Sequence, residues 1–171
     1  MPDSFFAPEL RPLVRQARVL WLIIAASLLY VAENAVTMPV PWLRLGLSNV
    51  FVLVAARRLG FVRTMQVAWG KTLLGALATG QLLTPIFLIN LSGATIAAVL
   101  TGGLAGVRML SLVGISTMAA WGHVWGQLAA AGLLWGDPLP VLGLAPILLG
   151  MALITGPVTG WLAEKVNAEL G

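Results

Sequence analysis

Long apolar stretches recur along nearly the whole chain, and they limit its possible folds more than any other feature of the sequence. Of the 171 residues, 59% are hydrophobic and 9% are charged, whereas soluble domains carry about a quarter charged residues. The stretches are long enough to cross a hydrocarbon core of about 30 Å. Inside lipid, backbone polar groups must be bonded within the protein, which runs rich in Leu, Ala and Gly achieve as helices. The sequence therefore predicts an all-α, polytopic membrane protein.

Proline and glycine residues divide the apolar sequence into six expected transmembrane helices. These helices cover residues 18–37, 43–59, 62–79, 85–106, 109–135 and 140–162. The expected transmembrane domain thus occupies residues 18–163, with a leader at residues 1–17 and a short tail at residues 164–171. The leader's arginines precede an apolar run, as in a signal peptide, but no cleavage site of small residues follows, so the first helix is expected to be retained.

The positions of the basic residues predict how the helices are oriented. Six spans place both termini on one side of the membrane, and basic residues concentrate in the segments on that side, which favours the cytoplasm. We therefore expect a multi-pass protein of the cell inner (cytoplasmic) membrane, with both termini cytoplasmic and lipid around it. The formal charge of +4 reflects this topology and does not indicate a nucleic-acid partner, because the cations are scattered. The residues on the predicted cytoplasmic side are Arg11, Arg15, Arg18, Arg57, Arg58, Arg63, Arg108 and Lys165.

Small residues four positions apart predict close packing between helices inside the bundle. Tryptophans near the ends of the spans are expected at the two membrane interfaces, Trp21 and Trp161 inside and Trp42 and Trp135 outside. The small-residue pairs are Gly93 with Ala97, Ala94 with Ala98, Gly102 with Gly106, and Gly122 with Gly126.

The segment Gly70-Lys71-Thr72 ends like a nucleotide-binding phosphate loop, but the remainder of that motif is missing. Such a loop needs glycine five residues before Gly70, and that position is Met65. The chain has no cysteine and one histidine, which leaves no thiolate or histidine cluster for a metal. No cofactor is therefore expected, and Lys71 needs another explanation.

Polar side chains interrupt the apolar helices at similar depths. A helix rises about 1.5 Å per residue, which places Lys71 near the middle of the bilayer and the other polar residues in its outer half. Charged groups in hydrocarbon cost about 2.5–3.5 kcal/mol, so they are expected to face a cavity or each other. The candidate ligand-binding residues are Glu33, Arg44, Asn49, Lys71, Asn90, His123 and Gln127.

Two interpretations of these residues remain open. In the first, they form an outward-facing pocket that favours a small anionic ligand, since two cations and a histidine outnumber one carboxylate. Trp121 and Trp125 would then cover an apolar part of the ligand, although packing within the bundle is the commoner role. In the second, Glu33 forms an internal ion pair with Lys71 or Arg44, and Arg44 alternatively reaches the outer headgroups.

Three motifs resemble a known family, the bacterial Gx transporters, also called heptaprenyl diphosphate synthase component I. The motifs are LRLGLSNV at 43–50, GKTLLGALATGQLLTPIFLINLSG at 70–93 and SLVGISTMAAWGHVWGQL at 111–128, and the resemblance extends over about residues 20–162. The family is similar to the S components of energy-coupling factor transporters, six-helix proteins that capture a ligand and associate with an ATPase module. Matching positions are Arg44, Gly46, Asn49, Gly75, Gly80, Pro85, Ser92, Gly93, Gly114, His123, Gly126 and Gln127.

This sequence departs from the pattern of the family and of S components at three places. Lys71 stands where the family has arginine, which keeps the charge but loses bidentate geometry. Val124 stands where asparagine commonly follows the histidine. The first helix has Leu29 four residues after Ala25, not the alanine pair through which S components dock on their energising module.

The resemblance implies a transport component that captures a ligand, and the family's second name implies an alternative. That alternative is a non-catalytic membrane subunit associated with a prenyl diphosphate synthase. Prenyl transfer itself needs clustered aspartates that hold magnesium on a diphosphate, and the only aspartates are Asp3 and Asp137. In neither interpretation is this chain expected to be an enzyme.

Overall fold

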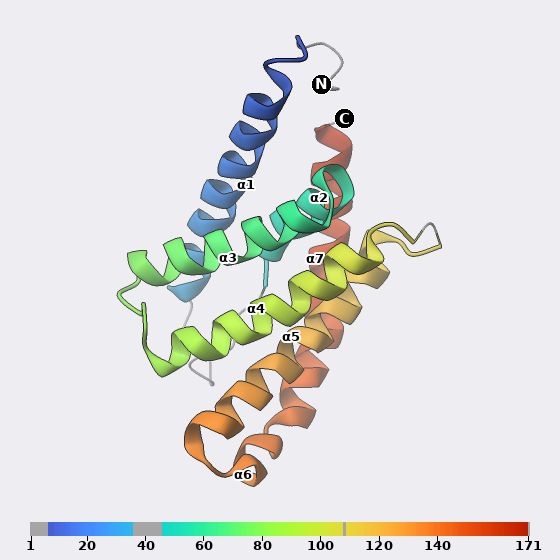
Figure 1. Ribbon diagram of the computed structural model, residues 1–171. Helices are drawn as coiled ribbons and strands as arrows, with labels where there is room; N and C mark the ends of the chain where they lie inside the picture. The colour runs from blue at the N-terminus through green and yellow to red at the C-terminus, as the bar shows by residue number, and fades with distance from the viewer. Residues whose placement is uncertain (1–6, 36–45, 108, 171) are drawn as a thin grey trace.

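The computed structural model describes residues 7–35, 46–107 and 109–170, and the regular structure of these residues is entirely helical. The all-α prediction is therefore confirmed. The helices pack in antiparallel neighbours, with α4 against α5 and α5 against α7 forming the most extensive pairs (Figure 1). They are α1 (Arg11–Asn34), α2 (Asn49–Leu59), α3 (Phe61–Ala78), α4 (Pro85–Leu104), α5 (Leu112–Trp135), α6 (Pro138–Leu142) and α7 (Ala145–Glu169).

The short helix α2 occupies the centre of the bundle. It packs against α1, α3, α4 and α7, and its residues from Val50 to Ala56 are all buried except Phe51. A helix that is apolar around its whole circumference has to be surrounded by other elements. Its 11 residues rise about 16 Å, roughly half the thickness of a bilayer's hydrocarbon core.

Glycines with positive φ end two of the helices. Gly60 alone joins α2 to α3, at φ 83° and ψ −180°, a conformation that residues with a Cβ rarely adopt. Gly136 closes α5 at φ 71°, and the Asp137 carboxylate then accepts from Leu139 N–H at 3.0 Å to begin α6. These breaks fall where the sequence predicts them.

Three helix limits differ from the prediction. The first helix begins at Arg11, seven residues before the expected start, so the second half of the predicted leader is helical. The helix that contains Asn49 begins at that residue, six residues after its predicted start. The last predicted helix is divided into two helices, α6 and α7, because the chain turns between Leu142 and Ala145. Helix α7 then continues to Glu169 and includes most of the predicted tail.

Two arginines at the end of α2 bind the carboxyl ends of other helices. Arg57 donates to Ala105 O at 2.6 Å and to Leu110 O at 3.1 Å. Arg58 donates to the Asn167 side chain at 2.7 Å and to Leu170 O at 2.9 Å. The last carbonyls of a helix lack partners within that helix and favour a nearby cation. These arginines therefore tie α2 to the ends of α4 and α7, near the end of the molecule where both termini lie (Figure 1).

Several of the predicted small-residue positions are sites of close packing, whereas a Cβ added at Gly106 would meet nothing within 4 Å. A Cβ added at Gly126 of α5 would lie 2.9 Å from Gly93 Cα of α4, and one at Gly122 would lie 2.3 Å from Leu100 Cδ1. Between α5 and α7, a Cβ at Gly160 would lie 2.5 Å from Val113 Cα. At Gly126 and Gly160 the helix backbones approach so closely that only glycine fits, whereas at Gly122 the close neighbour is a leucine side chain.

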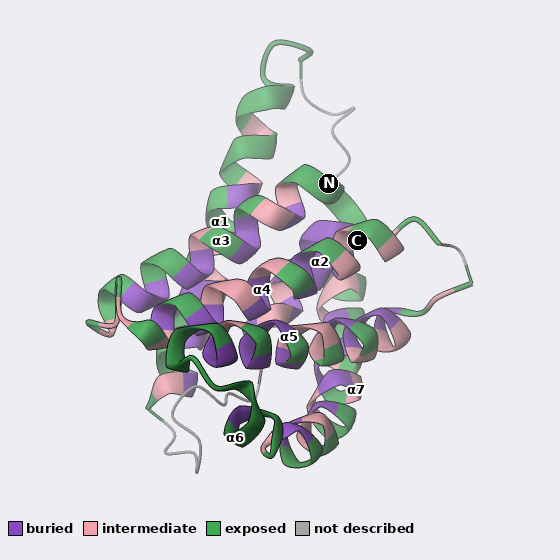
Figure 2. Ribbon diagram, turned by 60° about the horizontal axis from the view of Figure 1, so that its bottom comes forward, coloured by how far each residue is buried: buried purple, intermediate pink, exposed green. Residues whose placement is uncertain are grey.

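Exposed residues face outward and buried residues face inward (Figure 2), and many of the exposed residues are large and hydrophobic. On α1 the residues Leu20, Ile24 and Leu28 form an exposed stripe, each more than half exposed. Among the described residues, three helical segments are long and apolar enough to cross a membrane, namely Arg11–Asn34, Pro85–Leu104 and Pro138–Glu169. This composition is that of a membrane protein.

Replacing Gly126 with alanine is expected to destabilise the fold by about 1–3 kcal/mol, because the new methyl group overlaps backbone atoms of α4. The matched control is Gly103→Ala, also in a helix, where a Cβ meets nothing within 4 Å. Thermal unfolding of the detergent-solubilised protein measures both. Equal losses in the two variants would show that the α4–α5 contact is not close.

Candidate functional site

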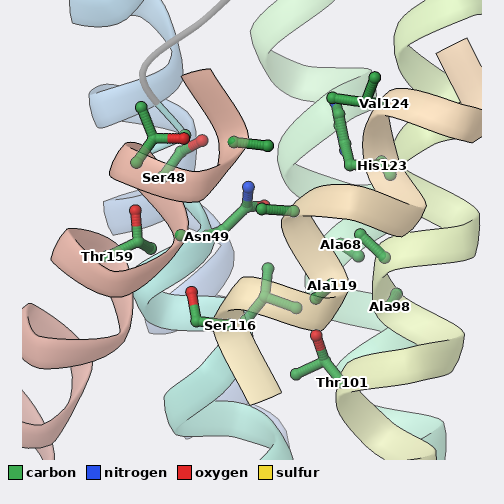
Figure 3. Close-up of a pocket in the computed structure, with 18 of the residues that line it drawn as sticks. Ser48, Asn49, Ala68, Ala98, Thr101, Ser116, Ala119, His123, Val124 and Thr159 are labelled. Carbon is green, nitrogen blue, oxygen red and sulfur yellow. The ribbon is translucent and has the colours of Figure 1, made fainter. Parts of the chain in front are cut away.

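A cavity of about 80 Å³ lies inside the bundle, and α1, α2, α3, α4, α5 and α7 all contribute to its walls. A buried space needs about 10–15 Å³ to hold one water molecule, so this cavity has room for several waters or a slender ligand. Its walls include all the predicted site residues that the structure describes. They are Glu33, Asn49, Lys71, Asn90, His123 and Gln127, of which Figure 3 labels Asn49 and His123.

The Glu33 carboxylate holds the turn that leads into α2. It accepts hydrogen bonds from Leu47 N–H and, at 3.1 Å, from the Ser48 hydroxyl. Gly46 and Ser48 lie in this turn and line the cavity. Irregular backbone at membrane depth is tolerated where it lines a cavity or is buried in protein, and here the carboxylate supplies the acceptors that the turn needs.

Lys71 enters the same network from α3. Its ammonium group donates to Ser48 Oγ at 3.0 Å and to Asn49 Oδ1 at 2.7 Å, and its side chain is 3% exposed. The Ser48 hydroxyl thus links Lys71 to Glu33 by accepting from the first and donating to the second. Lys71 is therefore held against neutral oxygens on the cavity wall, beside the carboxylate.

Asn90 of α4 and Gln127 of α5 form a pair of hydrogen-bonded amides. Gln127 Nε2 donates to Asn90 Oδ1 at 3.1 Å, and both side chains are 3% exposed. This bond directs the Asn90 amide so that Nδ2 points away from Gln127. Nδ2 is buried and bonds to no described residue. A buried donor of this kind is costly unless it meets an acceptor, such as a water or a ligand.

Alanines explain why the middle of the cavity is empty. Ala68, Ala94, Ala98, Ala119 and Ala152 line it between the polar groups. A methyl side chain fills little of the space between helices whose separation is set by neighbouring contacts. The middle of the cavity is therefore narrow and apolar.

Besides Tyr30, Ser48 and Thr72, three further buried hydroxyl residues line the cavity, and none of the three is among the predicted site residues. Thr101, Ser116 and Thr159 are 2%, 5% and 3% exposed. In Figure 3, Thr101 lies below Ala98 and Ala119, on the side away from His123. The sequence gives little signal for them, because serine and threonine in a helix commonly bond to their own backbone.

The predicted role of the tryptophans is wrong. Trp121 and Trp125 are 40% and 47% exposed on the outside of α5 and are not among the cavity-lining residues. They follow Met118 along a helix face that points out of the bundle, so they neither cover a ligand nor fill the core. Arg44 and Trp42 lie outside the described residues.

Taken together, these features define a class: an all-helical protein with membrane-length apolar segments and a buried polar cavity. The family described as heptaprenyl diphosphate synthase component I matches residues 22–166. Because this match covers most of the chain, the protein belongs to the heptaprenyl diphosphate synthase component I family, as the sequence motifs predict. The family's name describes one component of a synthase. No curated protein and no solved structure matches the chain.

The Glu33→Ala variant is expected to lose about 2–5 kcal/mol of stability, because Leu47 N–H and the Ser48 hydroxyl lose their acceptor inside the bundle. Glu33→Gln keeps one carbonyl oxygen and should lose less. Glu164→Ala, an exposed glutamate on α7, is the control and should shift stability by no more than about 0.5 kcal/mol. The measurement is chemical or thermal unfolding in detergent. An equal loss of stability in Glu33→Ala and Glu164→Ala would show that Glu33 does not stabilise the turn before α2.

Proposed function

We propose that this protein is an integral membrane transport component that captures a small anionic ligand in an outward-facing pocket, in the manner of an S component. One observation carries the proposal. Six polar residues, distant in sequence and contributed by α1 to α5, line a single cavity in an otherwise apolar bundle. Polar and ionisable groups within a membrane are costly, and in this position they mark a ligand or ion site by default.

The donors in the cavity favour a negative group. Lys71 carries a positive charge, Asn90 Nδ2 is a buried donor, and the amino end of α2 at Asn49 adds a positive dipole. Both oxygens of Glu33 already accept hydrogen bonds from the chain. A carboxylate or similar anion between Lys71 and Asn90 meets donors on both sides. His123 and Gln127 set its orientation.

The proposed topology has six membrane spans, with both termini in the cytoplasm and lipid around the apolar surface. Its support is the length of α5 and α3, with 24 and 18 residues, which rise about 36 Å and 27 Å. The helix α2, with 11 residues, accounts for about half of its proposed span. Broken helices whose ends meet a site near the membrane middle are common in transporters.

The source of energy is a separate part of the proposal. An ATPase module of the kind that S components use needs a docking face on this bundle. On α1, Ala26 is fully buried and Tyr30 packs under Gly75, while the outward face carries large residues such as Ile24 and Leu28. If an energising module is used, it meets a surface of bulky side chains on α1.

The Lys71→Met variant is expected to retain at least tenfold less anionic ligand than the wild type, since the cation is lost while the side chain keeps its length. Lys71→Arg keeps the charge and is expected to retain more ligand than Lys71→Met. The measurement is mass spectrometry of small molecules released when the purified protein is denatured.

The control is Lys165→Met, which removes an exposed lysine that lies over Trp161. Thermal unfolding verifies that each variant is folded. Equal retention of an anionic compound by the wild type, Lys71→Met and Lys165→Met would remove the ligand-binding role of Lys71.

The family's name favours a second candidate function, a non-catalytic membrane subunit associated with heptaprenyl diphosphate synthase. In that role the chain brings a soluble synthase to the membrane, where its isoprenoid product is soluble. The exposed basic residues at the terminal end, including Arg57 and Arg58, would lie on the side that faces the synthase.

Affinity purification from detergent-solubilised membranes tests this alternative. Stoichiometric recovery of a prenyl diphosphate synthase, together with wild-type protein that releases no anionic small molecule, favours the alternative over ligand capture. Recovery of the ligand without a synthase favours capture.

A further inference from the structure

Two sets of hydroxyls differ in their bonding among the described residues. Six buried or half-buried hydroxyls donate to the carbonyl four residues earlier, for example Thr72 to Ala68 O at 2.8 Å and Thr117 to Val113 O at 2.8 Å. The same pattern holds for Ser27, Thr64, Thr79 and Thr95. These hydroxyls satisfy themselves within their own helix.

The second set does not follow this pattern. Thr101, Ser116 and Thr159 line the cavity and are at most 5% exposed, and their hydroxyl groups form no hydrogen bond with any other described residue. They come from three different helices, α4, α5 and α7. A Cβ at Gly160 would lie 3.0 Å from Ser116 Cβ, which places the Thr159 turn of α7 against Ser116. We call these three residues the hydroxyl end of the cavity.

The hydroxyl end is separated along α4 and α5 from the Asn90–Gln127 amide pair, whereas Asn49 lies nearer to it, because Val50 packs in one cluster with Ile115. Asn90 and Thr101 are 11 residues apart on α4, and Ser116 and Gln127 are 11 residues apart on α5. Each interval corresponds to about 16 Å along a helix. Lys71 is somewhat nearer to Thr101. The Trp69–Thr95 hydrogen bond places these two residues at the same level of the antiparallel helices α3 and α4. Lys71 is therefore about eight residues, or roughly 12 Å along the helix axis, from the level of Thr101.

The chemistry of the two ends differs. The first end has an ammonium group, a carboxylate, a histidine and three amides, whereas the hydroxyl end offers neutral groups that both donate and accept. Apolar alanine walls separate them. A cavity of about 80 Å³ that extends over such a distance is narrow and suits a slender molecule.

We propose that the hydroxyl end is a second binding subsite, which takes a neutral hydrogen-bonding group of an elongated ligand whose anionic group lies between Lys71 and Asn90. This inference rests on the proposed ligand-binding function and specifies the ligand class. The ligand is an unbranched carboxylate, or similar anion, with an apolar middle and a hydroxyl or other neutral polar group at its far end.

Pairs of defined compounds test the proposal. The probes are ω-hydroxy carboxylates of eight, ten and twelve carbons, each compared with the unsubstituted carboxylate of the same length. Binding is measured by calorimetry with the protein in nanodiscs and with empty nanodiscs subtracted. At the length that reaches the hydroxyl end, the hydroxyl is expected to tighten binding about three- to tenfold, as one neutral hydrogen bond does. Non-specific partition into lipid gives the opposite order, because the added hydroxyl favours water.

Near-isosteric variants test whether the three hydroxyl residues cause the tighter binding of the hydroxylated compounds. Thr101→Val, Ser116→Ala and Thr159→Val are each expected to reduce the ratio of the two affinities toward one. Thr117→Val is the matched control, since it removes a hydroxyl one residue from Ser116 that bonds to its own helix and does not line the cavity. That control keeps the ratio of the wild type.

Two results would overturn the second subsite: no preference for the hydroxylated compound at any length, or a preference that survives in all three variants. If Lys71→Met still weakens binding of every carboxylate, ligand capture at Lys71 stands without the second subsite. If Lys71→Met binds all carboxylates as the wild type does, the proposed function itself fails. A wild-type protein that binds none of the probes overturns the elongated-carboxylate ligand class.

Discussion

The buried network of Glu33, Ser48, Lys71 and Asn49 is the interaction on which the centre of the structure depends. The turn before α2 lies inside an apolar bundle, where an unbonded backbone N–H is costly. Glu33 accepts from that turn twice, and Lys71 donates to Ser48 and Asn49 within and just after it. Because each charged group meets hydrogen-bonding partners, the network offsets part of the cost of burying both charges.

Small residues have two effects in this bundle. Glycines allow close contacts between helices, and alanines leave space for the cavity. At Gly93 and Gly126 the backbones of α4 and α5 nearly touch, and this contact fixes the register of the two helices. One turn along α4 from Gly93, Ala97 lines the cavity, as do Ala94 and Ala98. The spacing of the helices is set by the glycines, so the short alanine side chains cannot fill the space that remains.

Residue depth and charge predicted several of the residues that line the cavity, but not the hydroxyl residues Thr101, Ser116 and Thr159. Lys71 and Glu33 stand out in sequence because a charge within an apolar run demands a partner. Thr101 and Ser116 do not stand out in the sequence, since a serine or threonine within a helix usually donates to the carbonyl four residues earlier. Only the coordinates distinguish Ser116, which lines the cavity, from its neighbour Thr117, which bonds to Val113.

The fold was predictable at the level of helices and breaks, and less so at helix ends. Apolar runs and the breaks at Gly60 and Gly136 were sufficient to predict most elements. The start of α2 was not predictable, because the apolar pattern continues across the turn that Glu33 holds by tertiary hydrogen bonds. The outward position of Trp121 was not predicted either, since aromatic residues occur both in protein cores and on lipid-facing surfaces.

Different forces hold the two sides of the cavity. The α4–α5 side depends on van der Waals contact between backbones at Gly93 and Gly126, where any outward shift loses contacts along the whole helix pair. The α1–α2 side depends on hydrogen bonds from Ser48 and Lys71 to oxygen atoms. A bound anion competes for those same donors, because an ammonium group bonds to a carboxylate more strongly than to a hydroxyl. Anion binding is therefore expected to rearrange the Lys71 contacts and to leave the glycine contacts in place.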